Sequence, residues 1–282
     1  MQRFILTLSC PDRKGIVAAV ANFLVAQDCN IVDSAQSSDE QKGLFFMRVS
    51  FAAGQMGTAP DLRGAFSAVA GEFAMQWAIH DSAVKPRVVI MVSKFGHCLN
   101  DLLYRHRIGA LAIEIPAIVS NHRDFYQLAA SNNIPFHYMP VTAANKPKQE
   151  EQLLELLREE RCDLVVLARY MQVFSASMCE QLRERAINIH HSFLPSFQGA
   201  KPYQQARERG VKLIGATAHY VTEDLDEGPI IEQDVARVDD RMSVEDYVGV
   251  GRDVESAVLA RAVKWHVEHR VLLNGNRTVV FS

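Results

Sequence analysis

The sequence predicts an α/β protein with two domains, a small α+β domain followed by a doubly wound, mostly parallel sheet. Over residues 1–82, strand-like and helical patterns follow the order β-α-β-β-α-β, which is the ferredoxin-like arrangement. From residue 87 onward, apolar strand runs alternate with longer helical stretches. That alternation is typical of right-handed βαβ units in a parallel sheet. We therefore predict one domain over 1–82, a linker over 83–86 and a second domain over 87–282.

Each element of the first domain rests on a local pattern. Residues 3–9 alternate as a strand does, and residues 14–27 carry apolar side chains at helical spacing. Two further strand-like runs, 30–37 and 44–51, are separated by a polar turn, and a helix over 60–74 and a strand over 76–81 follow. A proline ends the short stretch 83–86, which indicates a linker.

The second domain has more elements of both kinds. The predicted strands are 88–93, 112–119, 136–139, 164–168, 187–190, 212–221 and 230–238, and the predicted helices are 97–107, 123–131, 148–161, 202–209 and 244–271. In open parallel sheets, ligands bind beyond the carboxyl ends of the strands. Residues 93–97, 120–121 and 169–172 should therefore line one crevice, with the end of strand 187–190 beside them.

Composition limits the class of partner. The chain has 282 residues and a formal net charge of −3, which gives no electrostatic footprint for a nucleic acid or an anionic membrane. A small molecule is the expected partner. Five scattered cysteines without a Cys-x-x-Cys pair favour reduced thiols in the cytoplasm. No signal peptide and no apolar run of about 18 residues is present, so we expect a cytoplasmic protein.

Residues 187–229 contain the constellation that can carry chemistry, namely Asn188, His190, His219 and Asp226. If 187–190 ends a strand, its period-2 alternation places Asn188 and His190 on one face. Each residue also has an ordinary structural explanation, because Asp-Glu-Gly-Pro is turn chemistry and a histidine at a strand end is commonly a hydrogen-bonded structural residue. Their occurrence in one stretch favours an active site.

Other kinds of site find less support. The first βα turn lacks a dinucleotide fingerprint, which argues against nicotinamide chemistry. Ser192 has no Gly-x-Ser-x-Gly context and is a poor acyl-enzyme nucleophile. Zinc would need His190, His191 and His219, yet adjacent histidines on an extended backbone point to opposite sides. We therefore predict no metal.

The opening stretch LTLSCPDRKGIV resembles the ACT family of small-molecule sensing domains. Its Asp-x-x-Gly-Ile element corresponds here to Asp12, Gly15 and Ile16. A glycine-bearing turn at a helix N-terminus offers free N–H groups to a carboxylate. The resemblance implies an amino-acid effector bound by these residues, and a homo-oligomer, a dimer or a tetramer, formed by pairing of ACT-like sheets.

The stretches INIHHSFLPSF and GATAHYVTEDLDEGPIIEQ resemble the folate-dependent formyltransferase family. The family's catalytic Asn-x-His and later Asp correspond, at the family's spacing, to Asn188, His190 and Asp226, with His219 supporting the carboxylate. The resemblance also implies a folate substrate, no cofactor, and loops that bind the pterin. The predicted substrate-binding residues are Arg169, Tyr170, Met171, Gln172, Val173, Val221, Thr222 and Glu223.

The fused ACT-like domain, the first loop SKFGHC and His191 after His190 most resemble the formyltetrahydrofolate deformylase branch of that family. Its implied reaction is hydrolysis of 10-formyltetrahydrofolate to formate and tetrahydrofolate. Phe95, His97 and Cys98 crowd the loop that would hold an acceptor's phosphate, which leaves water as the acceptor. Because Lys94 could pair with a phosphate, formyl transfer to a small amine such as glycinamide ribonucleotide stays an alternative. A non-catalytic small-molecule sensor is the other.

Overall fold

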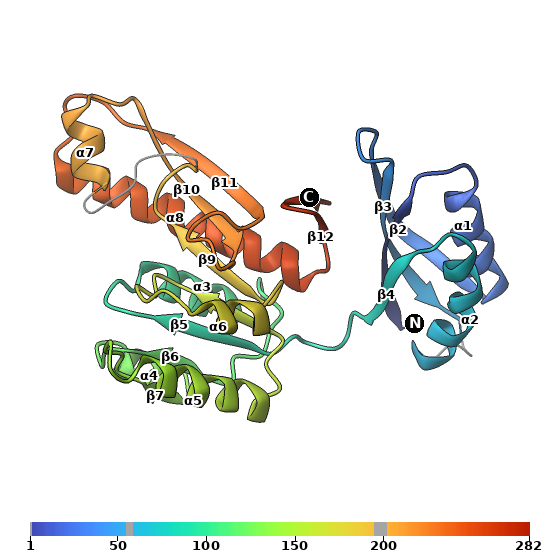
Figure 1. Cartoon of the computed structure of the whole chain (residues 1–282), viewed down its shortest axis with the longest axis horizontal. Coiled ribbons are helices and arrows are strands. Elements are labelled where there is room, and N and C mark those ends of the chain that lie inside the picture. Colours follow the sequence, from blue (N-terminus) through green and yellow to red (C-terminus); the bar gives the residue numbers. More distant parts are fainter. Residues whose placement is uncertain (1, 55–58, 195–201) are drawn as a thin grey trace. The chain divides into compact units, whose positions relative to one another are not determined.

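The computed structural model describes residues 2–54, 59–194 and 202–282, which form two compact units (Figure 1). Met1–Lys85 and Glu268–Ser282 make the first unit, and Pro86–Val267 make the second. The passage from the first unit to the second falls inside the predicted linker 83–86. The predicted second domain, however, extended to residue 282, so its C-terminal boundary must be corrected to residue 267.

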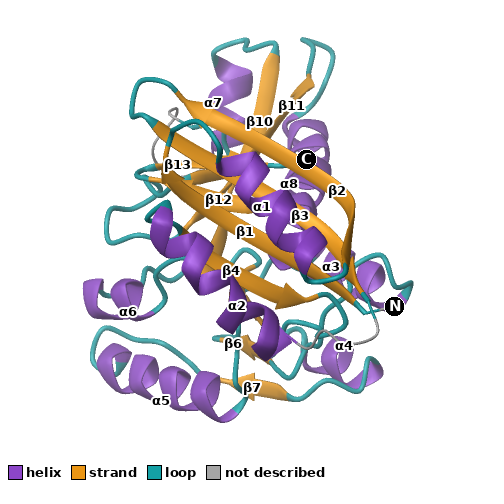
Figure 2. Cartoon of the chain, turned by 90° about the vertical axis from the view of Figure 1, so that its right-hand side faces the viewer, coloured by secondary structure: helices purple, strands orange, loops and turns teal. Residues whose placement is uncertain are grey.

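The first unit contains a four-stranded antiparallel sheet in the order β2-β3-β1-β4. Its elements are β1 (Arg3–Pro11), α1 (Ile16–Ala26), β2 (Cys29–Asp39), β3 (Leu44–Ala53), α2 (Ala59–Glu72) and β4 (Gln76–Asp81). This order confirms the predicted β-α-β-β-α-β arrangement. In Figure 2, α1 and α2 lie in front of the strands of this sheet. Alternate residues of β1 and β3 face these helices in one core, among them Phe4, Leu6, Leu8, Met47, Val49 and Phe51.

The end of the chain covers the other face of this sheet. A hairpin of β12 (Val271–Asn274) and β13 (Arg277–Val280) follows a backbone stretch that binds Arg48, a residue of β3 that is only 5% exposed. The Arg48 guanidinium donates to the carbonyls of Glu268 and His269, both at 3.1 Å, because alternation turns it away from the helices. A buried guanidinium needs such partners. This explains why 268–282 belongs to the first unit.

The second unit is built on a seven-stranded sheet in the order β11-β10-β9-β8-β5-β6-β7. The strands are β5 (Val88–Val92), β6 (Ile118–Ser120), β7 (Phe136–Tyr138), β8 (Leu164–Leu167), β9 (Ala186–His190), β10 (Leu213–Tyr220) and β11 (Ile230–Arg237). The pairs from β9 through β7 are parallel, and β10 and β11 are added antiparallel. The predicted mostly parallel, doubly wound sheet is confirmed.

Helices flank this sheet on both faces. They are α3 (His97–Arg107), α4 (Tyr126–Ser131), α5 (Lys146–Glu159), α6 (Ala176–Gln181), α7 (Pro202–Glu208) and α8 (Val244–Val267). Residues of α5 and α6 share one core with Val89, Met91 and Val165, whereas α8 packs with α3 and along β9, β10 and β11. Within the described residues, no helix is long and apolar enough to cross a membrane.

Two predicted elements are markedly shorter in the structure, and α6 and the C-terminal hairpin were not predicted. The predicted strand 112–119 is reduced to β6, since Pro116 cannot donate to a sheet ladder. The short helix α6 was not predicted; its N-terminus is capped by Ser175, whose Oγ accepts from the Met178 N–H. The predicted helix 244–271 ends at Val267, because His269 adopts a left-handed backbone with φ 54° and the chain continues as β12.

Candidate active site

A cavity of about 740 Å³ lies in the second unit where β8 and β9 end. Asn188 and His190 of β9, His219 of β10 and Asp226 of the loop after β10 all line it, so the structure brings the four predicted site residues together. The neighbouring strand ends support its wall. Ser93 at the end of β5 accepts from the Met171 N–H at 2.9 Å and donates to Asn121 at 2.7 Å. Among the described residues, however, no member of 93–97 or 120–121 lines the cavity, contrary to the prediction.

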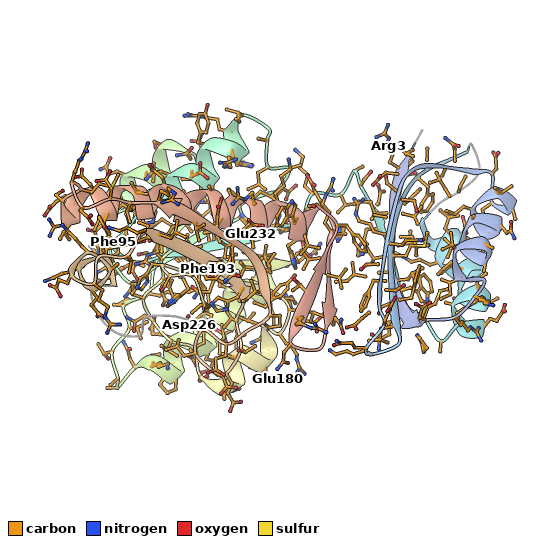
Figure 3. All side chains as sticks on the ribbon, turned by 90° about the horizontal axis from the view of Figure 1, so that it is seen from above. Arg3, Phe95, Glu180, Phe193, Asp226 and Glu232 are labelled. Carbon is orange, nitrogen blue, oxygen red and sulfur yellow. The ribbon has the colours of Figure 1, made fainter. Side chains whose placement is uncertain are left out.

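Asp226, labelled in Figure 3, is the anionic centre of this site. Its Oδ2 lies 3.1 Å from Nδ1 of His190, and its Oδ1 lies 3.5 Å from Nε2 of His219. Burial opposes ionisation, but the hydrogen bonds from the two histidines outweigh it and hold the pKa of the Asp226 carboxyl well below its usual range. Because the carboxylate can only accept, Nδ1 of His190 carries the proton, and Nε2 is the atom left for proton transfer.

His219 is fixed from its other side. Its Nδ1 donates to the Tyr220 carbonyl at 2.9 Å, and the residue is 2% exposed. The loop returns against the same carbonyl through Gly228, where a Cβ would overlap the Tyr220 oxygen. Only glycine therefore permits this approach, which brings Asp226 into place with a left-handed backbone at φ 60°.

Asn188 belongs to the same hydrogen-bonded group. Its Nδ2 lies 3.3 Å from Nε2 of His219 and 3.4 Å from Oδ1 of Asp226. The amide therefore lies within hydrogen-bonding distance of both groups. The Asn188 N–H groups are thus engaged within the site, and donation to a substrate oxygen requires that one of these long bonds be exchanged.

His191 lies beside His190, and the prediction for this pair was wrong. The two rings stack with centroids 4.8 Å apart and planes 24° apart, whereas extended backbone would have pointed them to opposite sides. The reason is that β9 ends at His190, so the strand alternation no longer holds at the next residue. Both imidazoles line the cavity.

Most of the predicted substrate-binding residues line the cavity as well. They are Arg169, Tyr170, Met171, Gln172, Val173, Val221 and Thr222. Glu223 is exposed and is not part of the lining. Sequence analysis did not identify the apolar lining residues Phe174, Cys179, Leu194 and Leu225. Their apolar side chains, close in sequence to the predicted loops, were the signal that could have indicated them. Burial raises the pKa of Tyr170 to about 12, so its phenol stays protonated.

Comparison with known proteins gives the family. The model of the formyl transferase family matches residues 86–263, and that of the ACT domain matches residues 4–58. A formyltetrahydrofolate deformylase from Corynebacterium is 51% identical over 99% of this chain and 98% of its own length. The chain belongs to the formyltetrahydrofolate deformylase family.

Solved structures agree with this assignment. The crystal structure of the formyltetrahydrofolate deformylase from Burkholderia mallei has a TM-score of 0.96 and 54% identity, with full coverage of both chains. A glycinamide ribonucleotide transformylase from Symbiobacterium toebii has a TM-score of 0.65 and 30% identity over 70% of this chain and 95% of its own. The chain therefore shares most of its fold with a transferase.

The turn that follows β5 in the second unit is filled by side chains. Gly96 packs so closely on the ring of Phe125 that a Cβ would overlap it. The Phe95 ring, labelled in Figure 3, lies 5.8 Å from the Arg169 guanidinium carbon and 5.9 Å from that of Arg252. His97 Nε2 lies 2.8 Å from Glu255. These contacts pack side chains into the turn that follows β5.

His97, Cys98 and Glu255 form the one cluster with ligand atoms within 4.8 Å that the described part of the chain offers to a metal. Their chemistry does not suit a cation. Arg169 lies 3.3 Å from the Glu255 carboxylate and would repel an ion there. Burial raises the pKa of the Cys98 thiol far above its usual range, so the sulfur keeps its proton and is a poor ligand.

The predicted regulatory residues lie together at the start of α1. Gly15 caps the helix with φ 99°, and no side chain caps its first turn. The Asp12 N–H donates to the Gly43 carbonyl at 2.8 Å. Ile16 is 2% exposed and packs in the core of the first unit, so only its backbone can meet a ligand.

We predict that Gly228→Ala lowers kcat by about 100-fold, because the new methyl group pushes the Tyr220 carbonyl and His219 away from Asp226 and misplacements of this size are costly. Steady-state kinetics together with thermal melting measure it. The matched control is Gly249→Ala in α8, where a Cβ meets nothing within 4 Å. Unchanged kcat in Gly228→Ala would show that the loop tolerates the displacement.

Proposed function

We propose that this chain hydrolyses 10-formyltetrahydrofolate to formate and tetrahydrofolate in the cavity beside Asp226. The observation that carries the proposal is an ionised carboxylate held by two imidazoles on the wall of a cavity of about 740 Å³, a size usual for small-molecule sites. Backbone groups and apolar side chains of residues 169–173 and 221–225 would hold the pterin. Membership of the deformylase family supports the substrate.

The first step forms a bond between water and the formyl carbon. Nε2 of His190, unprotonated while Nδ1 donates to Asp226, accepts the proton that the water loses. The formyl oxygen becomes an oxyanion and needs fixed donors. The Asn188 amide can supply one N–H if it releases Asp226 or His219. Asp226 stays ionised throughout and stabilises the imidazolium that His190 becomes.

The second step breaks the bond between the formyl carbon and N10. His190 returns its proton to N10, so tetrahydrofolate leaves as a neutral amine and the formyl group as formic acid, which loses its remaining proton to solvent and becomes formate. The residues are then in their starting protonation states. No atom in this sequence changes oxidation state, and His190 and the solvent account for both protons of the attacking water. We therefore propose that the reaction uses neither a metal nor a cofactor.

The first prediction of this proposal concerns the acceptor. Purified protein should release formate from 10-formyltetrahydrofolate without any added amine, because the turn at Phe95 and Gly96 is filled. Formate detection by a coupled dehydrogenase measures it, and the rate should survive exhaustive EDTA treatment. Release only in the presence of glycinamide ribonucleotide would make the transferase alternative correct.

Asp226→Asn is the control for that assay. The amide cannot accept and stabilise charge as the carboxylate does, so formate release should fall by roughly 10⁴-fold, while thermal melting and folate binding change little. No formate release from the unaltered protein, with folate binding intact, would instead favour the sensor alternative.

We also propose that the first unit binds an amino acid. The ACT domain match over residues 4–58 supports a small-molecule site there. The uncapped start of α1 at Gly15 supports its position, since free N–H groups and the positive helix end suit a carboxylate. Asp12, beside this turn, is exposed and can meet an ammonium group.

Calorimetric titration of the full-length protein with each of the common amino acids tests this effector site. We expect one or a few to bind, and Asp12→Ala to weaken that binding while formate release without effector is unchanged. Flat titrations with all of them would remove the effector proposal and leave the catalytic one untouched.

We further propose a cytoplasmic homo-oligomer, a dimer or a tetramer. All five cysteines are buried free thiols, which suits a reducing compartment. In the first unit, β2 is an outer strand with Ile31 37% and Val32 47% exposed, and an open apolar edge favours pairing with a second copy. Sedimentation at micromolar concentration should give a multiple of the 31.6 kDa chain mass. A monomer alone would contradict this.

A further inference from the structure

Arg169 fixes the tautomer of His191. The Arg169 Nη1 lies 2.9 Å from Nδ1 of His191. A guanidinium can only donate, so Nδ1 must accept through its lone pair, and the proton of the neutral ring sits on Nε2. Burial, followed by the positive charges of Arg169 and His190, lowers the pKa of His191 to about 4 despite Glu255 and Asp226. At neutral pH the ring is thus an uncharged N–H donor.

The guanidinium is itself held in a buried polar network. Its Nε lies 3.3 Å from Oε2 of Glu255, a residue of α8 that is 1% exposed. Glu255 also accepts from the Tyr203 hydroxyl at 2.5 Å and contacts His97 at 2.8 Å. Burial opposes its ionisation, but His97 and Arg169 outweigh burial and lower its pKa. The backbone of Arg169 is left-handed, at φ 65°, and such a conformation needs surrounding contacts that hold it.

His190 and His191 are therefore stacked rings with different properties. Nδ1 of His190 faces a carboxylate and Nδ1 of His191 faces a guanidinium. The first ring is equipped to gain and lose a proton at Nε2, and the second to keep one there. Environments that separate two neighbouring titratable groups in this way are a mark of divided catalytic roles.

The reaction needs a donor that this second ring can supply. In the resting site the Nδ2 of Asn188 is engaged by His219 and Asp226, and both oxygens of Asp226 face imidazoles. The developing oxyanion carries a full charge and gains most from donors that are already fixed. His191 lines the same cavity as these groups, and its N–H does not depend on pH near neutrality.

We propose that His191 is a further catalytic residue, whose Nε2–H donates to the oxygen of the formyl group as the tetrahedral intermediate forms, with Arg169 and Glu255 as positioning residues that set this tautomer. This inference rests on the proposed hydrolysis. His191 keeps its proton throughout, so the proton transfers remain those of His190. Because the ring is uncharged, it also does not oppose formation of the adjacent His190 imidazolium.

The test compares two substitutions of one side chain. His191→Phe keeps a flat ring against His190 but removes the donor, and kcat should fall about 100-fold with KM changed less than about threefold, as for loss of one oxyanion donor. His191→Gln restores an N–H near the position of Nε2 and should recover at least about tenfold of that loss. A role in packing alone would favour Phe over Gln, which is the opposite order.

Nitrogen-15 NMR of the imidazole rings tests the tautomer directly. The full-length protein should show an Nε2–H, Nδ1-unprotonated ring whose signals vanish in His191→Phe. Arg169→Lys keeps a positive charge beside Glu255, but the lysine ammonium cannot contact both Glu255 and His191 as the planar guanidinium does. It should therefore shift these signals and lower kcat while melting stays close to that of the unaltered protein.

The outcomes separate this inference from the function itself. If His191→Phe keeps kcat within about threefold while Asp226→Asn abolishes formate release, the donor role is wrong and the hydrolase stands. An Nδ1-protonated His191 would also overturn it. If the unaltered protein releases no formate, the proposed function fails first.

Discussion

The site depends on keeping one half-buried carboxylate ionised. Asp226 is held by His190 and His219, and without them burial would favour the neutral acid. The constraint extends into the backbone, since the left-handed turn at Asp226 and the close approach at Gly228 bring the carboxylate to the imidazoles. The fold and the loop geometry thus place Asp226, and Asp226 in turn fixes the proton of His190 on Nδ1.

The sequence allowed the fold class and the centre of the site to be predicted because their signals are local. Alternation in 187–190 placed Asn188 and His190 on one face, and β9 has them both lining the cavity. The Asp-Glu-Gly-Pro segment could be recognised as a turn from the sequence. Its need for glycine at position 228, however, depends on the Tyr220 carbonyl at the end of β10. Periodicity carries no information on such contacts.

Long-range features could not be predicted for the same reason. Glu255 appeared as one charge on a helical pattern, and only the packing of α8 against α3 shows that it is buried beside His97 and Arg169. His191 was assigned to the wrong side, because strand alternation was extended one residue beyond the strand. The tail 268–282 was placed in the second domain, because nothing local shows that Arg48 would need its carbonyls.

The network around Glu255 links two properties of the second unit. Phe95 and His97 lie in the turn that resemblance to the transferases assigns to an acceptor's phosphate, and His97 at the same time helps to hold Glu255 ionised. Glu255 in turn holds Arg169, and Arg169 sets the tautomer of His191. One set of contacts therefore both fills the turn at Phe95 and His97 and fixes His191 as a neutral donor beside His190. A chain that reopened the turn for an amine acceptor would lose part of the support for that donor, so water as the acceptor and the His190–His191 pair belong together.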